Sequence, residues 1–468
     1  MGSAGAAPVA TAAGGGGGDG DLHVVMFPFL AFGHISPFAQ LARKMAGVGA
    51  GVRVTFLSAA ANVPRVEAML GGTGGTSTVA ALELPRVPGL PEGAESTAEV
   101  SADGAELLKL AVDGTRPQVE ALLARLHPDV VLFDFATPWV VDVARPLGVK
   151  AALFSVFAAV SGAYVMAPAR RRLPGPWRPT VDDLASAPEG FPPSSPLATV
   201  PAYQAADFSY VFESFHGMPC VYDRVAACHN ACDALVIKTC AEMEGPYIDY
   251  IAAEHGKPVL VTGPSCRSRA RRAGGAVGAW LSLSFPDNSV RDLPAARRRD
   301  GAPPRTRGHR PAVLAVLNFP KGTDAEAELR KLTPPGLEER VKGRGILHTG
   351  WVQQQHILRH RSVGCFVNHS GLSSVVEGLV AGCRLVLLPM KGDQYLNAAL
   401  FARELRVARR ARDGWFGRED VRDALAAAFA GGEDGGGEEK KWREFLMDDA
   451  VQRRFVREFV AGLRRLKG

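Results

Sequence analysis

The chain has 468 residues, of which 47% are hydrophobic and 22% are charged; this is long enough for two or three globular domains and excludes a fibrous or disordered chain. The formal net charge of +6 comes from one segment, Arg267–Arg310, in which eleven arginines stand against three aspartates. The rest of the chain carries a net charge of about −2, so its composition does not predict a nucleic-acid-binding or other polyanion-binding protein.

Residues 1–21 are rich in alanine and glycine and lack the basic start and apolar core of a signal peptide, so we interpret them as a flexible tail. After the tail, apolar strand candidates alternate with helix candidates, which predicts a parallel sheet covered on both faces. The predicted strands of this half are His23–Phe29, Val52–Ala59, Pro128–Asp134, Asp233–Thr239 and Pro258–Gly263. A glycine-histidine turn precedes a helix expected from about Pro37 to Ala46, and a long amphipathic helix is expected over Ala105–Leu126.

The apolar stretch Ala151–Pro168 has about the length of a membrane-spanning helix. It follows Pro146–Lys150, a sequence typical of a turn between a helix and a strand, and it divides into a short buried strand and an apolar helix. We therefore interpret it as part of a soluble core and expect no transmembrane segment.

Seven scattered cysteines are an odd number, which argues against a secreted disulfide framework and favours a reducing compartment. We therefore expect a cytoplasmic protein. Cys228 and Cys232 flank His229, but no second pair follows at zinc-finger spacing, so we interpret them as helix residues and expect no metal site.

The second half repeats the alternation, with predicted strands at Val313–Phe319, Gly345–Gly350, Val363–Asn368 and Arg384–Pro389. Two Rossmann-like halves in sequence predict an α/β fold with two parallel sheets facing each other across a cleft, and ligands beyond the carboxyl ends of the strands. The expected parts are the tail 1–21, an N-terminal domain 22–264, a linker with an arginine- and proline-rich piece 265–311, a C-terminal domain 312–449 and a last helix 450–468.

The segment from Arg267 to Pro311 departs from this alternation. We interpret Trp280–Val290 as the approach to a strand, but the residues after it have no periodicity and are rich in arginine and proline. One interpretation is a disordered surface loop. Another hypothesis is an out-of-frame or mis-spliced reading of a GC-rich gene, which an in-frame transcript containing this segment would refute.

The segment Trp351–Gln394 carries the strongest functional pattern. A strand predicted to end at Asn368 is followed by a tight His-Ser-Gly turn and by a helix that starts near Leu372. The free backbone amides and the positive dipole end of such a helix attract anions. The hydroxyls of Ser373 and Ser374 in its first turn can also donate hydrogen bonds to a phosphate, although serine at a helix start is most often a simple cap.

Further residues of this segment fit the other parts of a nucleotide sugar. His369 can donate to a phosphate, and Trp351 offers a flat face on which a base stacks, worth about 1–3 kcal/mol. Glu377, one turn further along the helix, can accept from two ribose hydroxyls. Asp393 and Gln394 follow the next strand at the same sheet edge and can bind sugar hydroxyls. Their order and spacing predict a nucleotide-sugar site, and the chain is then a sugar transferase.

Two residues of the first half are candidates for the chemistry: His34, after the first strand, and Asp134, at the end of a later strand. An acceptor hydroxyl must lose its proton as it attacks the anomeric carbon of a sugar. An imidazole takes such a proton near neutral pH, and a carboxylate orients the ring and stabilises the imidazolium. The competing interpretations are a turn histidine and a helix cap. No Asp-x-Asp sequence lies in the folded part, so we expect chemistry without a metal ion, with the helix end, Ser374 and His369 stabilising the leaving diphosphate.

Together these motifs resemble plant UDP-dependent glycosyltransferases of family 1, enzymes of the GT-B fold. The resemblance runs from His23 to the last helix; the signature box matches without a gap over Trp351–Gln394, and FPFLAFGHISP resembles the loop with the catalytic histidine. The site roles that it implies are a base and its acidic partner (His34, Asp134), a uracil platform (Trp351, Val352), ribose ligands (Gln354, Glu377), diphosphate ligands (His369, Ser374) and a sugar pair (Asp393, Gln394). Gly371 and Ser373, in the turn and helix start between the diphosphate ligands, are further candidates for donor binding. It also implies that the N-terminal domain binds the acceptor, that the last helix returns to it, and that a UDP-sugar is a co-substrate with no cofactor.

The motifs WVQQ, GCFVNH and LAVLNFPKG resemble the branch of this family that adds a sugar to flavonoid or anthocyanin glycosides. The implied reaction is inverting transfer to a hydroxyl of a flavonoid or its glycoside. In this family a glutamine at the end of the signature box, here Gln394, is associated with glucose donors. Rhamnose and xylose remain alternative donor sugars. The implied acceptor pocket comes from the variable stretches Pro85–Ala102 and Leu173–Met218. We expect a monomer.

The chain departs from the family pattern at two places. Leu372 and Ser373 replace residues that commonly line the donor site, and no Ser-Phe-Gly-Ser type loop follows Val290. A central strand of the C-terminal sheet is then absent or replaced, and such a loss exceeds the net stability of a typical domain. We therefore predict weak or no turnover, so that a relative which only binds a nucleotide sugar or a partner is the alternative. A dinucleotide-dependent enzyme is disfavoured, because no Gly-x-Gly-x-x-Gly follows the first strand.

Overall fold

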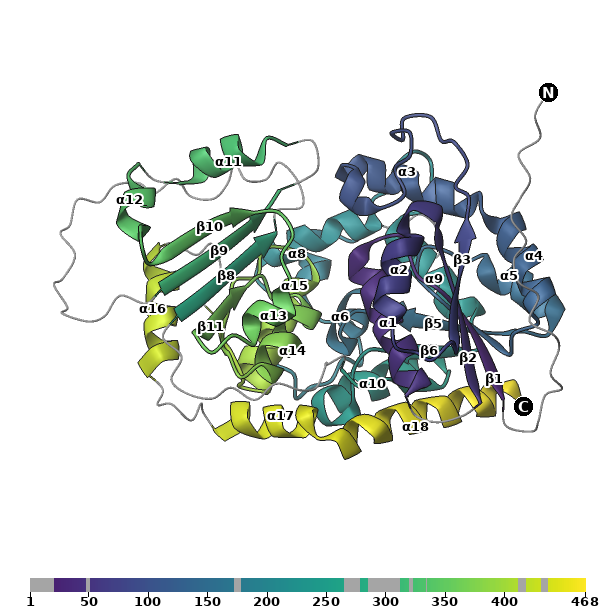
Figure 1. Cartoon of the computed structure of the whole chain (residues 1–468). Coiled ribbons are helices and arrows are strands. Elements are labelled where there is room, and N and C mark those ends of the chain that lie inside the picture. Colours follow the sequence, from purple (N-terminus) through teal and green to yellow (C-terminus); the bar gives the residue numbers. More distant parts are fainter. Residues whose placement is uncertain are drawn as a thin grey trace, which may run out of the picture.

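The structure is a computed structural model, and it describes residues 21–47, 51–171, 178–264, 278–284, 312–319, 323–333, 335–410, 418–430 and 437–468. These residues form two α/β halves that lie side by side, each built around a parallel sheet (Figure 1). The predicted fold class is confirmed.

The sheet of the N-terminal half has seven parallel strands in the order β3-β2-β1-β4-β5-β6-β7. Their bounds are β1 (Leu22–Phe27), β2 (Val52–Ala59), β3 (Ser77–Leu82), β4 (Val130–Phe133), β5 (Lys150–Ser155), β6 (Ala234–Ile237) and β7 (Val259–Val261). Val25 and Phe27 of β1 pack into the core on one face of the sheet, whereas Val24 and Met26 pack into the core on the other. Because helices cover both faces, the central strands read as continuous apolar runs.

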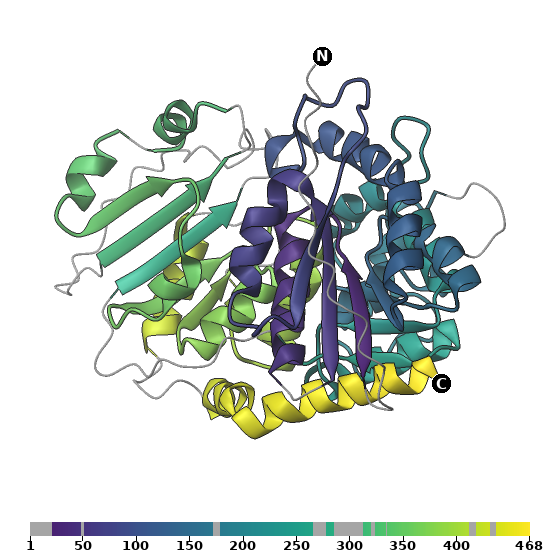
Figure 2. The same ribbon diagram turned by 45° about the vertical axis from the view of Figure 1, so that its right-hand side comes forward.

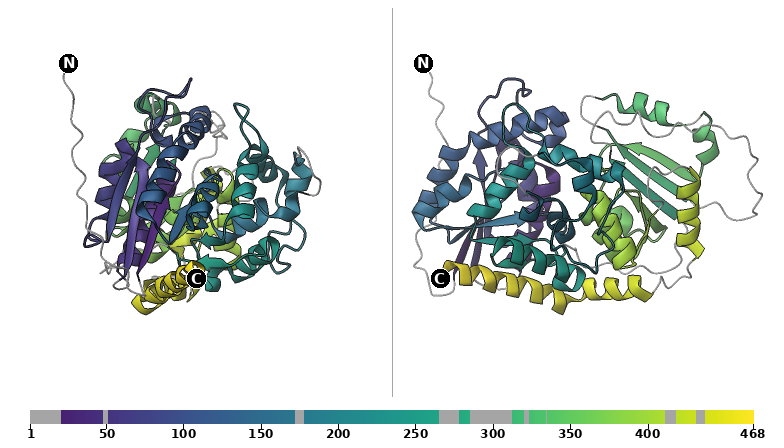
Figure 3. Two further views of the ribbon diagram at one scale, coloured as in Figure 1. Left: turned by 90° about the vertical axis from the view of Figure 1, so that its right-hand side faces the viewer. Right: turned by 180° about the vertical axis from the view of Figure 1, so that it is seen from behind.

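The helices of this half surround the sheet, as the views from the side and from behind show (Figure 3). They are α1 (Phe32–Ala46), α2 (Val63–Leu70), α3 (Ala102–Asp113), α4 (Arg116–Leu126), α5 (Val140–Ala144), α6 (Ala159–Val165), α7 (Val181–Ala185), α8 (Ala202–Phe208), α9 (Val221–Ala231) and α10 (Ala241–His255). The short 3-10 helix η5 (Ser209–Phe212) continues directly from α8.

The sheet of the C-terminal half has six parallel strands in the order β10-β9-β8-β11-β12-β13. Their bounds are β8 (Gly278–Ser284), β9 (Ala312–Asn318), β10 (Gly345–Thr349), β11 (Val363–Asn368), β12 (Arg384–Leu387) and β13 (Arg409–Arg410). Its helices are α11 (Ala325–Leu332), α12 (Leu337–Val341), α13 (Gln354–Leu358), α14 (Leu372–Val380), α15 (Asp393–Ala399), α16 (Arg418–Ala430), α17 (Gly437–Met447) and α18 (Asp449–Lys467).

Strand β8 corrects the interpretation of the arginine-rich segment. Trp280–Val290 was expected to be the approach to a strand, but the strand is Gly278–Ser284 itself, within the expected linker. It pairs in parallel with β9 on one side and β11 on the other, so the central position of the sheet is filled. The reason is that an apolar run flanked by two strands gains ladder hydrogen bonds on both edges. Residues 285–311, including the missing loop after Val290, lie outside the described residues.

Two helix predictions of the first half were wrong in their bounds. Helix α1 begins at Phe32, not near Pro37, because its buried face already starts at Ile35 and continues through Phe38, Ala39 and Ala42. The catalytic candidate of that loop is therefore a first-turn helix residue and not a turn residue.

The long helix expected over Ala105–Leu126 is two helices, α3 and α4. The chain breaks at Gly114, where an added Cβ would lie 2.5 Å from Cγ of Pro85, and Pro117 follows at the start of α4. Close packing against a neighbouring loop and a helix-starting proline outweigh the continuous apolar period.

The apolar stretch Ala151–Pro168 supplies strand β5 and helix α6, both in the core. Among the described helices, none combines the length and the apolar character needed to cross a bilayer. Cys228 lies in α9, Cys232 caps its end, and both side chains are buried.

The last helix, α18, runs beneath the N-terminal half (Figures 1 and 2). Val456, Phe459, Val460 and Leu463 join the core that includes Val24 of β1. Helix α17 leads into it from the C-terminal half, so the chain ends by tying the two halves together.

Candidate active site

The predicted base and its acidic partner are in contact. Nδ1 of His34 lies 2.7 Å from Oδ2 of Asp134, although the two residues are 100 positions apart in the sequence. The contact arises because β1 and β4 are neighbours, so that α1 and the residue after β4 meet at the same sheet edge.

Asp134 is held rigidly and is almost fully buried. Its Oδ2 also accepts from the backbone N–H of Phe29 at 3.0 Å, and its Oδ1 accepts from the N–H of Phe135 at 2.8 Å. A carboxylate with three donors keeps its orientation and fixes the imidazole tautomer that presents Nε2 away from it. The rings of Phe29, Phe135 and Phe157 surround the imidazole at centroid distances of 6.0, 5.4 and 5.6 Å.

The diphosphate candidates form the turn between β11 and α14. Helix α14 has Gly371 as its N-cap, and no side chain caps its free amides. An added Cβ at Gly371 would lie 3.0 Å from Nε2 of His369, so a larger residue here would press on the imidazole. Ser370 adopts a left-handed conformation with φ of 68°, and its N–H donates to Asn368 at 2.8 Å. The turn therefore keeps the amides of a helix start open to an anion.

The base and ribose candidates lie beside this turn. Trp351 is 72% exposed, so its ring face is accessible to a flat ligand. Nε2 of Gln354 donates to Glu377 at 2.9 Å and to Ser374 at 3.1 Å, and Gln355 donates to the other Glu377 oxygen at 2.8 Å. The carbonyl of Val352 accepts the N–H of Gln354 at 2.9 Å. The glutamines thus fix the Glu377 carboxylate next to the anion-binding turn.

The sugar pair begins α15. Asp393 accepts from Nδ2 of Asn397 at 3.0 Å, and the same amide donates to the carbonyl of Ser370 at 3.0 Å. Gln394 turns its carbonyl back to its own loop, where it accepts from the N–H groups of Met390 and Lys391 at 2.9 and 3.2 Å. Asp393 is thereby linked to the diphosphate turn.

Electrostatics join the two halves of the site. Burial raises the pKa of Asp393 to about 6, and His34 is among the groups that oppose this rise. The imidazole of His34 and the carboxylate of Asp393 are therefore close enough for an electrostatic interaction. Tyr210 of η5 contacts the same loop, since an added Cβ on Gly392 would lie 3.6 Å from its hydroxyl.

Sequence reasoning missed several residues that complete this arrangement. Asn397 shares a helix face with Asp393 at i+4, a spacing that was visible in the sequence. Gln355 stands in the QQQ run beside a residue that was predicted. Asp207 of α8 accepts a hydrogen bond from the hydroxyl of Tyr395 in α15 at 2.7 Å. No local sequence pattern predicts this contact between the two halves.

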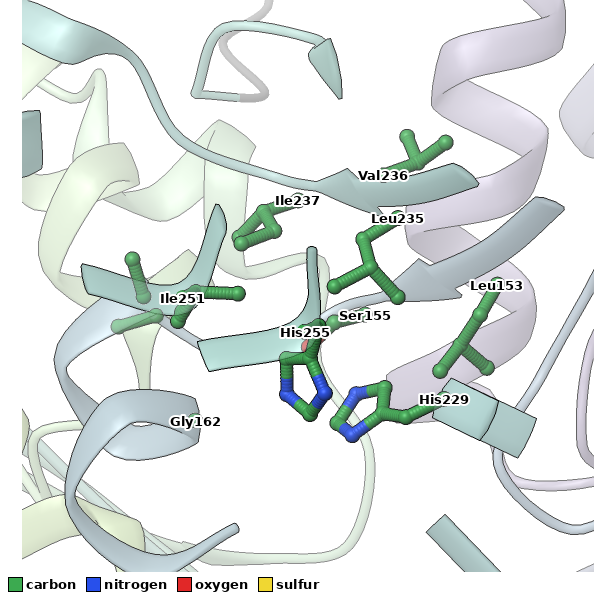
Figure 4. A pocket seen from close by; sticks show the side chains of 11 residues that line it. Leu153, Ser155, Gly162, His229, Leu235, Val236, Ile237, Ile251 and His255 are labelled. Atoms are coloured by element: carbon green, nitrogen blue, oxygen red, sulfur yellow. The ribbon is translucent and has the colours of Figure 1, made fainter. Parts of the chain in front are cut away.

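A separate small cavity, of about 30 Å³, lies in the N-terminal half and contains none of the predicted site residues (Figure 4). His229 and His255 line it with ring centroids 4.1 Å apart. Within the described part of the chain, no group of three or more histidine, cysteine, aspartate or glutamate side chains could hold a metal ion.

Comparisons with known proteins give a consistent result. A family model described as UDP-glucoronosyl and UDP-glucosyl transferase matches residues 329–430. A Petunia hybrida protein named anthocyanidin-3-O-glucoside rhamnosyltransferase is 43% identical over 464 residues, covering 94% of this chain and 95% of that protein. An Ipomoea purpurea anthocyanidin 3-O-glucoside 2''-O-glucosyltransferase is 33% identical, covering 95% and 98%. Arabidopsis thaliana UGT89C1, solved with UDP-L-rhamnose, shares the fold with a TM-score of 0.62 at 20% identity, covering 95% of this chain and 99% of that one.

Two parallel-sheet halves and these relatives define a glycosyltransferase of the GT-B fold. The chain belongs to the plant UDP-dependent glycosyltransferases of family 1. The predicted family, its sugar-on-sugar branch and the use of a UDP-sugar as co-substrate are confirmed by these relatives.

Proposed function

We propose that the protein transfers a sugar from a UDP-sugar to a hydroxyl of a flavonoid or flavonoid glycoside, with inversion at the anomeric carbon. The observation that carries this proposal is the contact of 2.7 Å between His34 and Asp134 in one half, with His34 close enough to lower the pKa of Asp393 in the other. The names of the Petunia and Ipomoea relatives support the acceptor class.

The geometry of the site supports a role for each of these residues. Because Nδ1 of His34 is bound to Asp134, Nε2 is the nitrogen that takes the acceptor proton. The acceptor oxygen forms a bond to the anomeric carbon, and the bond from that carbon to the UDP oxygen breaks. Asp134 stabilises the imidazolium, and the open amides of α14 stabilise the charge on the departing diphosphate.

The donor site uses the remaining predicted residues. Trp351 stacks on the uracil and the backbone of Val352 binds its edge, while Glu377, held by Gln354, accepts from the ribose. His369, Gly371, Ser373 and Ser374 surround the diphosphate, and Asp393 and Gln394 hold the sugar. Gln394 favours glucose, whereas the Petunia relative is named for rhamnose, so the donor assay must compare both with xylose.

The test is an assay of the purified chain with UDP-glucose, UDP-rhamnose and UDP-xylose, each against a flavonoid and its 3-O-glucoside, with product mass as the readout. The prediction of weak or no turnover rested partly on a missing central strand, and β8 fills that position, so we now expect a sugar-on-sugar product with at least one donor. The proposal is contradicted if no product forms from either acceptor with any donor and the protein also binds none of the three donors.

A second candidate function is binding of a nucleotide sugar without turnover. The observation in its favour is that the sequence after Val290 lacks the Ser-Phe-Gly-Ser type loop of the family. Calorimetric titration with UDP-glucose in parallel with the product assay separates the two functions, because binding without product selects this one. Turnover equal to that of an intact relative rejects it.

A further inference from the structure

Lys238 is only 2% exposed. Lysine side chains are rarely fully buried in proteins, so its position calls for a structural or functional explanation. It follows β6, at the carboxyl end of the strand, which is the edge of the N-terminal sheet where ligands of such folds bind. It belongs to none of the roles derived above.

The ammonium of Lys238 reaches across to the other half of the molecule. Its Nζ donates to Oγ of Ser373 at 2.6 Å. Ser373 is the second residue of α14, two positions after the N-cap Gly371 and next to Ser374. The lysine of one half therefore ends at the anion-binding helix start of the other.

This position places a second positive charge beside an anion-binding helix start. A helix N-terminus carries a partial positive charge, and the buried ammonium of Lys238 adds to its attraction for an anion. The same turn holds the buried atoms Nδ2 of Asn368 and Oγ of Ser370, which have no hydrogen-bond partner among the described residues. The two buried donors without partners and the positive charge at the helix start both favour a multiply charged anion at this turn.

We propose that Lys238 is a ligand of the donor diphosphate, supplied by the N-terminal half, and that it neutralises the UDP leaving group. The proposal rests on the proposed function of the α14 turn as the diphosphate site. Ser373 stands where the family usually has an asparagine, and the shorter side chain leaves the ammonium in hydrogen-bond contact with the first turn. The diphosphate is then held from both halves at once, which couples donor binding to their approach.

The experiment compares binding of uridine, UMP and UDP to the full chain by calorimetry at fixed pH and salt. Lys238→Met removes the charge and keeps an unbranched side chain of similar length, whereas Lys238→Arg keeps the charge. Lys257→Met is the matched control: Lys257 donates to three carbonyls at the end of α9 and lies away from the site. Thermal melting of each variant checks folding.

We expect Lys238→Met to weaken UDP binding by about tenfold to a hundredfold, as for loss of a charged hydrogen bond, and to leave uridine binding unchanged. UMP should fall between the two, Lys238→Arg should retain most of the UDP affinity, and Lys257→Met should change none of the three. The UDP affinity of the unmodified chain should also fall more steeply with salt than that of Lys238→Met.

Three results overturn the proposal. Unchanged UDP binding by Lys238→Met refutes the contact while leaving the α14 turn as a UDP site. Equal losses for uridine and UDP make Lys238 a structural tie between the halves. An unmodified chain that binds uridine and UDP with equal affinity has no diphosphate site at this turn, which overturns both this inference and the proposed donor role of the turn.

Discussion

At the scale of single residues, the site depends on which polar atoms already have partners. The carboxylate of Asp134 accepts hydrogen bonds from two backbone amides and one imidazole, so its position is fixed before any substrate binds. Glu377 is likewise fixed by two glutamines. Sequence predicted His34, Asp134 and Glu377, because their residue types follow strand ends or helix starts, whereas these partners depend on side-chain geometry.

Replacing His34 with alanine tests the base directly. We expect kcat to fall by about a hundredfold to ten-thousandfold, since that is the usual contribution of a general base. UDP affinity should be unchanged, because His34 belongs to the acceptor side of the site. Steady-state kinetics together with UDP titration are the measurements, and a variant that keeps kcat within a few-fold of the original contradicts the assignment.

The raised pKa of Asp393 predicts a pH dependence of donor binding. With a pKa of about 6, the carboxyl group is protonated below that pH and loses an acceptor for a sugar hydroxyl. We expect the KM for the UDP-sugar to rise as the pH falls from 7 to 5, with the change centred near 6. Asp393→Asn is the control, since it should have a high KM that does not respond to pH in this range. A flat profile for the unmodified protein rules the role out.

At the scale of elements, glycines set how closely α14 approaches its sheet. An added Cβ on Gly378 would lie 2.6 Å from Cδ2 of Leu385 and 2.8 Å from Cδ1 of Phe366. This close packing places the open N-terminus of α14 at the carboxyl edge of β11. The sequence predicted the start of α14 correctly from its turn, but nothing in the sequence showed how near the helix sits to β12.

Replacing Gly378 with alanine should therefore disturb both stability and the donor site. We expect a loss of about 1–3 kcal/mol in the free energy of unfolding, as for overpacking in a core, together with weaker UDP binding. Gly245→Ala in α10 is the matched control, because an added Cβ there meets nothing within 4 Å. Denaturant unfolding and UDP titration of both variants are the measurements. Equal stability of the two variants would falsify this packing argument.

At the scale of the whole molecule, buried histidines make stability depend on pH. Burial, as the largest cause, lowers the pKa of His23 to about 4, of His229 to about 3 and of His255 to about 4. In the unfolded chain these groups bind protons near pH 6.5, so the folded state loses stability as the pH falls from there towards 4. Asp393 acts in the opposite sense, because its raised pKa favours the fold at lower pH.

Replacing His229 with glutamine isolates one of these contributions. At pH 5 the neutral histidine should cost the folded state about 2 kcal/mol relative to pH 7, and the variant should lack this loss. We expect the melting temperatures of the two proteins to fall with different slopes between pH 6.5 and 4, the variant being less sensitive. Parallel slopes would show that His229 is protonated without penalty in the fold.

The sequence by itself determined the two-sheet α/β class and most strand positions, and it predicted the residues of both parts of the candidate site. It could do so because apolar runs, turns and helix starts are local signals, and because the box from Trp351 to Gln394 is contiguous. The exact helix limits at Gly114 and Phe32 were not local, since contacts with Pro85 and with a buried face decided them.

Only the tertiary structure decided what meets between the halves. Strand β8 lies at the centre of the second sheet because it pairs with β9 on one edge and β11 on the other. Its own residues did not predict a strand with these limits. The contacts of Lys238 with Ser373, and of Asp207 with Tyr395, join residues more than a hundred positions apart. Such pairs carry no sequence period, and they exist because the sheets bring their carboxyl edges together and α18 holds the halves in place.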